Sequence, residues 1–251
     1  MSNPTTNYTT IITAYFEITS KYPKEQYDEW MKIMLRNIAT PMVIFCDAKS
    51  IDKIRNYRLA YQSATVIIQK EISEFYNYKY LEQWKRTLEL DSEKNINNIE
   101  LYMIWAEKSQ FLKLGAEQNP FGSEFFLWCD IGYFRNTPEH IPIAELRNFP
   151  NIEKIKILPR DRMLMLLVKY ILLNKFNDKK IGGGMFGGFK ETISGWANTY
   201  DATLNFFFAN NIFAGQDQLI MKFILYKLPN LCLCIDSQKS EDWFLLHRLL
   251  M

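Results

Sequence analysis

The sequence predicts an α/β fold in which a mixed, mostly parallel sheet is flanked by helices. Two observations favour it: short apolar runs alternate with segments of helical spacing, and two of these runs end at an aspartate. Such alternation is typical of β-α-β units, whose crossover helices bring neighbouring strands into parallel. With 251 residues, 48% of them hydrophobic, the chain can bury a sizeable core, and we expect one domain over residues 1–251.

The first half of the chain supplies most of the strand signals. Residues 42–47 form a short apolar run that ends at Asp47, and residues 125–130 form another that ends at Asp130. Residues 98–116 keep the period of a helix between them. The elements predicted here are strands at 11–16, 42–47, 65–68 and 125–130, and helices at 27–37, 51–58, 73–94 and 98–116.

The second half gives mixed signals. Alternating Lys and Ile at 154–158 predict a strand, whereas the apolar stretch 163–173 fits either a strand or a buried helix, because its periodicity does not distinguish them. The glycine cluster at 182–188 predicts a turn or loop. The remaining predicted elements are helices at 191–210 and 216–226 and a strand at 231–235.

Charge and composition argue against several classes of protein. The 30 basic and 28 acidic residues are interspersed, so no basic patch indicates nucleic-acid binding. We see no secretory signal and no apolar stretch long enough to span a membrane. The four cysteines lie in apolar runs, which fits a reducing compartment, and we expect a cytoplasmic protein. The G-x-S-x-G and H-E-x-x-H motifs of hydrolases are absent.

Asp130 is the first candidate for a functional residue. The carboxyl ends of strands border the ligand crevice of open α/β sheets, so a carboxylate there can hold a metal ion or a ribose hydroxyl. Alternatively, Asp130 caps the following turn through its side chain, with Gly132 supplying a positive φ. The local sequence favours neither interpretation.

The glycine cluster contains the pattern G-x-G-x-x-G at Gly182, Gly184 and Gly187. A dinucleotide fingerprint should follow a strong strand, but a polar segment precedes this cluster, and no lysine stands where a P-loop needs one. Two interpretations remain. Glycine backbone can approach a ligand closely because it has no Cβ, or the cluster is a tight turn packed against the sheet.

Asp217 and His247 are further candidates. Asp217 falls in the first turn of a predicted helix, where it is either a cap or an acid held toward a cleft as a general base. His247 lies in an apolar segment, where a histidine is usually a structural residue. It is also a candidate to join Asp130 in binding Mn²⁺ or a similar ion.

Four segments taken in order resemble the HtrL/YibB family over nearly the whole chain. That family is similar to glycosyltransferases with the nucleotide-sugar-binding GT-A fold, often with W-x-D-x-G where better-known members have D-x-D. The resemblance rests on ITAYF at 12–16, NPF at 119–121, FLWCDIG at 126–132 and GMFGG at 184–188.

The resemblance implies a role for each candidate. Asp130 matches the first acid of D-x-D, which contacts ribose and metal, while Gly132 replaces the second acid. A bound Mn²⁺ or Mg²⁺ ion would then need His247 or a water molecule to complete its coordination. Thr13 and Tyr15 are expected beside the nucleobase, and Asp47 beside the base or the ribose. Lys108 is expected near the phosphates. The 184–188 loop, with Gly187 and Gly188, is expected near the sugar or acceptor, and Asp217 near the reacting centre.

We therefore expect a glycosyltransferase that moves a sugar from a UDP- or GDP-sugar to a carbohydrate or glycan acceptor. The charge developed on the departing diphosphate calls for a cation, and an attacking hydroxyl calls for a base if configuration is inverted. The alternative is a catalytically inactive interaction protein of the same fold, which the loss of the second acid at Gly132 favours. A Rossmann oxidoreductase rests on the glycine pattern alone.

Overall fold

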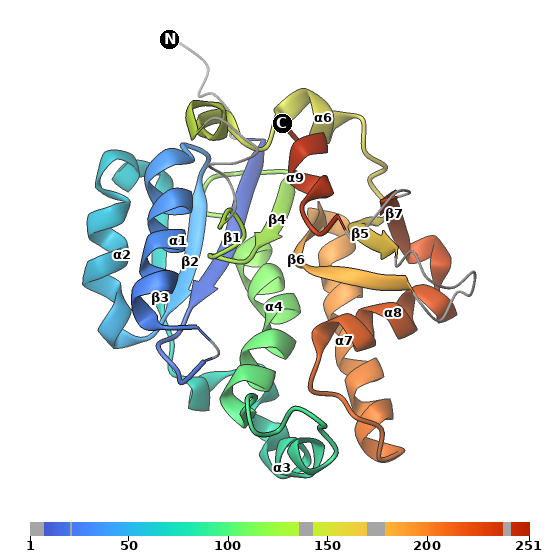
Figure 1. Ribbon diagram of the computed structural model, residues 1–251. Coiled ribbons are helices and arrows are strands. Elements are labelled where there is room, and N and C mark those ends of the chain that lie inside the picture. Colours follow the sequence, from blue (N-terminus) through green and yellow to red (C-terminus); the bar gives the residue numbers. More distant parts are fainter. Residues whose placement is uncertain (1–7, 21, 136–142, 170–178, 238–241) are drawn as a thin grey trace.

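The computed structural model describes residues 8–20, 22–135, 143–169, 179–237 and 242–251. In this part of the chain, one sheet has the strand order β3-β2-β1-β4-β6-β5-β7 (Figure 1). Every neighbouring pair is parallel except those of β6, which runs antiparallel to both β4 and β5. The predicted mixed, mostly parallel sheet flanked by helices is thus confirmed.

Most helices and strands lie close to their predicted positions. The strands are β1 (Thr9–Tyr15), β2 (Met42–Cys46), β3 (Thr65–Gln69), β4 (Phe125–Cys129), β5 (Met163–Lys169), β6 (Lys179–Phe189) and β7 (Cys232–Ser237). The α-helices are α1 (Lys24–Asn37), α2 (Ile51–Tyr57), α3 (Leu81–Glu89), α4 (Ile99–Gln118), α6 (Ile152–Lys156), α7 (Lys190–Ala209), α8 (Asp217–Lys227) and α9 (Leu245–Leu249).

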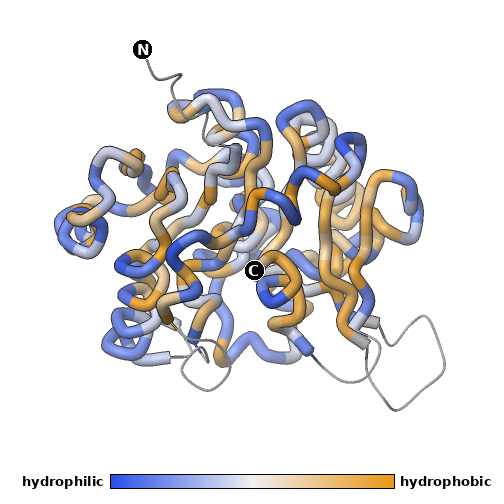
Figure 2. The backbone as a smooth tube through the Cα atoms, turned by 90° about the horizontal axis from the view of Figure 1, so that it is seen from above, coloured by the Kyte–Doolittle hydropathy of each residue, from blue (hydrophilic) through white to orange (hydrophobic). Residues whose placement is uncertain are grey.

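The sheet separates two hydrophobic cores. Alternate residues of each strand point to opposite faces, so Phe126 and Trp128 pack with α4, α7 and α8, while Phe125 and Leu127 pack with α1, α2, α6 and α9. Hydrophobic stretches run through the strands, whereas hydrophilic residues are concentrated in outer helices and loops (Figure 2). Burial on both faces explains the continuous apolar runs of the central strands.

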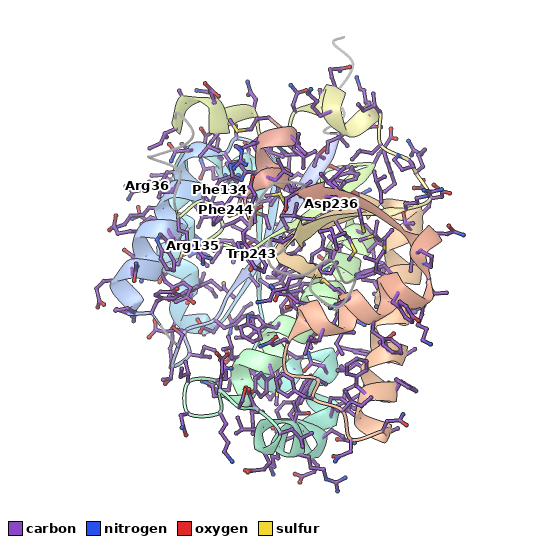
Figure 3. The ribbon with its side chains drawn as sticks, turned by 45° about the vertical axis from the view of Figure 1, so that its right-hand side comes forward. Arg36, Phe134, Arg135, Asp236, Trp243 and Phe244 are labelled. Carbon is purple, nitrogen blue, oxygen red and sulfur yellow. The ribbon has the colours of Figure 1, made fainter. Side chains whose placement is uncertain are left out.

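The C-terminal segment packs against the chain that follows β4. Phe134, Arg135, Trp243 and Phe244 lie together beside α9 (Figure 3). The Tyr133 hydroxyl donates to the carbonyl of Trp243 at 3.1 Å, and the Arg135 guanidinium lies 5.8 Å from the ring centroid of Phe244. These two contacts hold the turn after Asp130 against the C-terminal segment, on the side of the sheet that carries α9.

Two predictions for the second half are corrected or resolved. Residues 154–158 are not a strand, because Asn151 caps the short helix α6 by accepting from the Glu153 amide, and Ile155 is buried while Ile157 is exposed. The ambiguous stretch 163–173 forms strand β5 up to Lys169, and its last four residues lie outside the described part.

The glycine cluster is neither a turn nor a loop but the body of strand β6, inserted between β4 and β5. Gly187 pairs with Leu127, and a Cβ added to Gly187 would lie 2.5 Å from the Phe126 carbonyl oxygen. Because that contact is with backbone, only glycine fits there. A dinucleotide fingerprint is excluded as well, since its glycines need a turn that leads from strand to helix.

No helix in the described ranges combines the length and apolarity that crossing a membrane requires.

We predict opposite effects for two glycine-to-alanine substitutions. Gly187→Ala should lower stability by about 2 kcal/mol, because its methyl group overlaps the β4 backbone. Gly195→Ala, on α7 with no atom within 4 Å of the added Cβ, should raise stability by up to about 1 kcal/mol through helix propensity. Urea denaturation of both variants measures the difference, and equal stabilities would contradict the packing described for β6.

Candidate functional site

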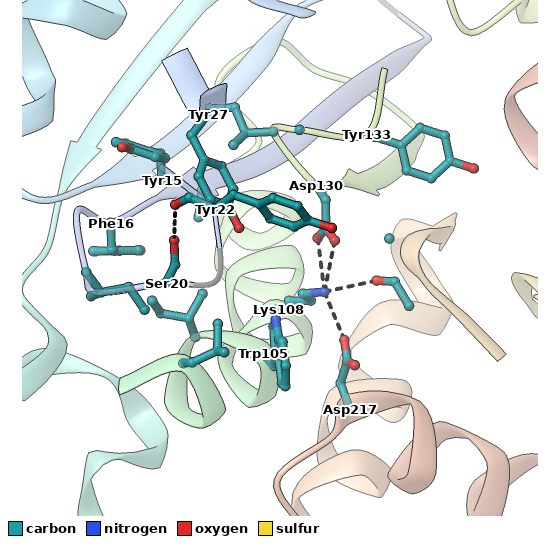
Figure 4. Close-up of a pocket in the computed structure, with 18 of the residues that line it drawn as sticks. Tyr15, Phe16, Ser20, Tyr22, Tyr27, Trp105, Lys108, Asp130, Tyr133 and Asp217 are labelled. Atoms are coloured by element: carbon teal, nitrogen blue, oxygen red, sulfur yellow. Dashed lines mark hydrogen bonds and ion pairs between the residues drawn. The ribbon is translucent and has the colours of Figure 1, made fainter. Parts of the chain in front are cut away.

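A cavity of about 460 Å³ lies where β1 and β4 end, beside the middle of β6 and the start of α8, with α4 along one side (Figure 4). Its volume is in the range of small-molecule sites. The residues that line it and enter the argument below are Tyr15, Glu17, Tyr22, Lys24, Tyr27, Glu93, Trp105, Lys108, Trp128, Asp130, Gly132, Tyr133, Arg135, Gly183, Gly184 and Asp217.

Asp130 follows β4 directly and faces this cavity with a side chain that is 40% exposed. Its backbone amide donates to the Gly184 carbonyl at 2.8 Å, and its carbonyl accepts from the Tyr133 amide at 2.8 Å. The turn is therefore closed by backbone groups. Oδ1 accepts a 2.8 Å hydrogen bond from Trp128 Nε1, because residues two apart in a strand point to the same face.

Lys108 lies at the inner end of the cavity, on the face of α4 that also presents Trp105. Its Nζ is 3.0 Å from Asp130 Oδ1, 2.9 Å from Asp217 Oδ2 and 3.1 Å from the Gly183 carbonyl oxygen. Burial alone would lower the pKa of Lys108, but the two carboxylates outweigh it and raise that pKa above its usual value. The ammonium is therefore charged.

Asp217 is the first residue of α8 and is buried. Its Oδ1 accepts from the backbone amide of Gln218 at 2.8 Å, and its Oδ2 pairs with Lys108. Burial raises the pKa of Asp217, the Lys108 ammonium lowers it, and the Asp130 charge raises it again, so that the net shift is upward. The Asp217 side chain therefore contacts the first turn of α8 and also lines the cavity, but α8 has no side-chain cap at its N-cap residue Gln216.

The cavity meets a different pair of glycines from the one expected. Because β6 is antiparallel to β4, the first half of β6 lies beside the end of β4, so Gly183 and Gly184 line the cavity. Gly187 and Gly188 pair instead with Leu127 and Phe126 inside the sheet. The expectation that the latter two contact a ligand is corrected, since they are away from the cavity.

Of the three residues expected beside the nucleobase or ribose, one lines the cavity and two do not. Tyr15, the last residue of β1, lines the cavity. Thr13 does not, because it is fully buried inside β1 and pairs with Ile44. Asp47 does not line the cavity either. Its two carboxylate oxygens accept from the backbone amides of Glu17 and Ser50 at 2.7 and 2.9 Å, so it fixes the chain that follows β1.

The residues expected to bind a metal are not gathered in one place. His247 lies on α9 with its ring centroid 5.6 Å from that of Tyr133, and it does not line the cavity. A Cβ at Gly132 would lie 3.2 Å from the Trp30 ring, so the position of the missing second acid is directed at that ring. Within the described ranges, no group of three or more His, Cys, Asp or Glu side chains could hold a metal ion.

Several residues of the cavity carried no signal strong enough to single them out in the sequence. Tyr22 and Tyr27 pack edge to face at 6.2 Å, and together with Trp105 they give the cavity an aromatic wall (Figure 4). Arg135 also lines it, 5.5 Å from the Trp30 ring. Trp128 is the exception, because strand alternation places it beside Asp130 and could have identified it.

Comparison with solved structures finds similar folds at low identity. Mouse xyloside xylosyltransferase 1, apo form, matches with a TM-score of 0.50 and 8% identity over 90% of this chain and 84% of that one. A 4-diphosphocytidyl-2C-methyl-D-erythritol synthase from Anaerococcus prevotii matches with a TM-score of 0.45 and 10% identity over 94% and 89%. The PaToxG glycosyltransferase matches with a TM-score of 0.40 and 9% identity over 88% and 70%.

At these identities the likeness shows the fold alone, and the GT-A-like fold class implied by the sequence is confirmed. No curated protein matches the chain. The model of one family, described as a bacterial protein of unknown function, matches residues 7–251. Since this match extends over nearly the whole sequence, the chain belongs to the HtrL/YibB family.

Proposed function

We propose that this protein is a glycosyltransferase that moves a sugar from a UDP- or GDP-sugar to the hydroxyl of a carbohydrate or glycan acceptor. One observation supports this most directly: the Asp130 carboxylate, at the end of β4, faces a cavity that also contains a second acid, Asp217. Among solved structures of the same fold is a xylosyltransferase, and fold analogy alone links this chain to that activity.

The residues that line the cavity suit a nucleotide sugar. Its aromatic wall offers rings against which a base or sugar face can pack. At the inner end, Gly183 and Gly184 present backbone without side chains beside Asp130. We assign the part lined by Tyr22 and Tyr27 to the nucleoside and the inner part, between Asp130 and Asp217, to the reacting sugar.

The charges around the cavity favour a donor that enters with a divalent cation. The described side chains that line it include four acids and three bases: Glu17, Glu93, Asp130, Asp217, Lys24, Lys108 and Arg135. A diphosphate would be repelled by this net negative charge. Mg²⁺ commonly uses one or two carboxylates together with substrate phosphates and water, and the exposed carboxylate of Asp130 fits that mode for Mg²⁺ or Mn²⁺. Such an ion, when bound, supplies positive charge for the departing diphosphate.

Asp217 is our candidate for the acid at the reacting centre. In an inverting reaction its carboxylate would accept the proton of the attacking hydroxyl, and burial that raises its pKa makes it a stronger base. The proton would then reside on Asp217 while the sugar–oxygen bond to the diphosphate breaks and the bond to the acceptor oxygen forms. In a retaining reaction no separate base is needed, and Asp217 would only shape the site.

Isothermal titration calorimetry with UDP and GDP, in the presence and absence of MnCl₂, tests the donor class. We expect one of the two nucleotides to bind, and to bind at least tenfold more tightly with Mn²⁺, because the ion offsets the acidic lining. NAD provides the control for the Rossmann alternative and should give no heat. Absence of binding by both nucleotides would contradict the proposed function.

Substitution by asparagine should mainly affect nucleotide binding at Asp130 and mainly affect Tm at Asp47. Asp130→Asn should weaken binding of the nucleotide with Mn²⁺ at least tenfold while shifting Tm by only about 3 °C, since its carboxylate is partly exposed. Asp47→Asn should leave binding within about threefold and lower Tm more, because it breaks a buried bond to backbone. A large loss of Tm in Asp130→Asn with unchanged binding would instead assign Asp130 a structural role.

A screen of UDP- and GDP-sugars for donor hydrolysis separates an enzyme from an inactive protein of the same fold. We expect one donor to be cleaved, and Asp217→Asn to reduce that rate at least about 100-fold if Asp217 is the general base. Asp52→Asn, on the exposed face of α2, is the matched control and should keep full activity. Nucleotide binding without cleavage of any donor would support the inactive alternative.

A further inference from the structure

Acceptor groups of the protein surround the Lys108 ammonium. A lysine ammonium has three N–H donors and no acceptor. The Nζ of Lys108 lies at hydrogen-bonding distance from three separate groups of the protein: the Asp130 carboxylate at 3.0 Å, the Asp217 carboxylate at 2.9 Å and the Gly183 carbonyl at 3.1 Å (Figure 4).

An irregularity in the sheet supplies the third of these partners. Along the ladder between β5 and β6, Met165 pairs with Phe186, but the next residue, Leu166, pairs with Gly182. The intervening residues of β6 therefore have no register partner in β5, and the Gly183 carbonyl accepts from Lys108 instead. Bulges of this kind re-aim groups beside functional sites.

Strand β6 packs closely against the Asp217 side chain. A Cβ added to Gly183 would lie 2.8 Å from Asp217 Oδ2, so β6 closes one side of the carboxylate. The charged and titratable groups that face Asp217 are Lys108 on α4, Asp130 after β4, and the Tyr200 hydroxyl on α7. Of these, only Lys108 attracts the carboxylate charge.

We propose that Lys108 is a positioning residue: its ammonium joins Asp217 to Asp130 and fixes the place of the Asp217 carboxyl group in the inner cavity, and it does not bind the donor phosphates. This replaces the phosphate role that the family resemblance implied for Lys108. The inference rests on the proposed function where it places Asp217 at the reacting centre. The ion cluster itself is tested without any nucleotide.

Carbon-13 NMR of protein labelled at the aspartate carboxyl carbon gives the test, with the Asp217 signal assigned by its loss in Asp217→Asn. In Lys108→Met we expect the proton affinity of Asp217 to rise at least about tenfold, because a paired opposite charge is removed from a buried acid. In Asp130→Asn we expect it to fall, because a like charge is removed. Lys113→Met, on the same helix and 3.9 Å from Glu117, should leave it unchanged.

The opposite signs distinguish positioning from a merely structural role. If Lys108→Met only loosened the packing, water would reach Asp217 and its pKa would move down, toward that of an exposed aspartate. A pKa of Asp217 that stays constant or falls in Lys108→Met overturns the proposal, and so does a rise in Asp130→Asn.

A second variant covers the case in which Lys108→Met does not fold. Lys108→Met/Asp130→Asn removes one positive and one negative charge, so the net charge of the cluster stays that of the natural protein. Because the effect of Lys108 on Asp217 exceeds that of Asp130, the pKa of Asp217 should still rise in this variant. A fall would overturn the proposal by the same reasoning.

Discussion

The buried ammonium of Lys108 is the interaction on which the candidate site depends. A buried charge is tolerated when opposite charges and polar groups lie close to it, and the Lys108 ammonium lies within 3.1 Å of two carboxylates and one carbonyl. These partners come from the end of β4, the start of α8 and the interior of β6. One side chain of α4 thus fixes the relative positions of the groups that surround the inner cavity.

The antiparallel course of β6 makes this arrangement possible. If β6 were parallel to β4, its last residues would lie beside Asp130, and the helix that follows would cover the cavity. Instead, its early glycines lie there, where Gly184 accepts from the Asp130 amide and Gly183 leaves room for Asp217. The glycines have two separate functions: Gly187 permits close pairing inside the sheet, and Gly183 shapes the site.

The two strand-end aspartates show how identical local patterns diverge. Asp47 and Asp130 each follow a fully buried strand of five residues. Asp47 accepts from two backbone amides and does not line the cavity. Asp130 contacts Trp128 and Lys108 but keeps a partly exposed carboxylate, because backbone groups close the turn after β4. The groups that surround each aspartate in the folded protein, and not the strand that precedes it, therefore decide whether its carboxylate is available to a ligand.

The sequence by itself determined the α/β class, most element positions, and Asp130 and Asp217 as acids of interest, because hydrophobic periodicity and helix or strand ends are local properties of the chain. It could not place the short helix α6, where a cap at Asn151 outweighs an alternating pattern. Only the tertiary structure decided that β6 is a strand, that Gly183 and Gly184 meet the cavity while Gly187 and Gly188 do not, and that His247 and Thr13 lie away from it. These features depend on strand direction and register, which bring together residues more than 50 positions apart and leave no local trace in the sequence.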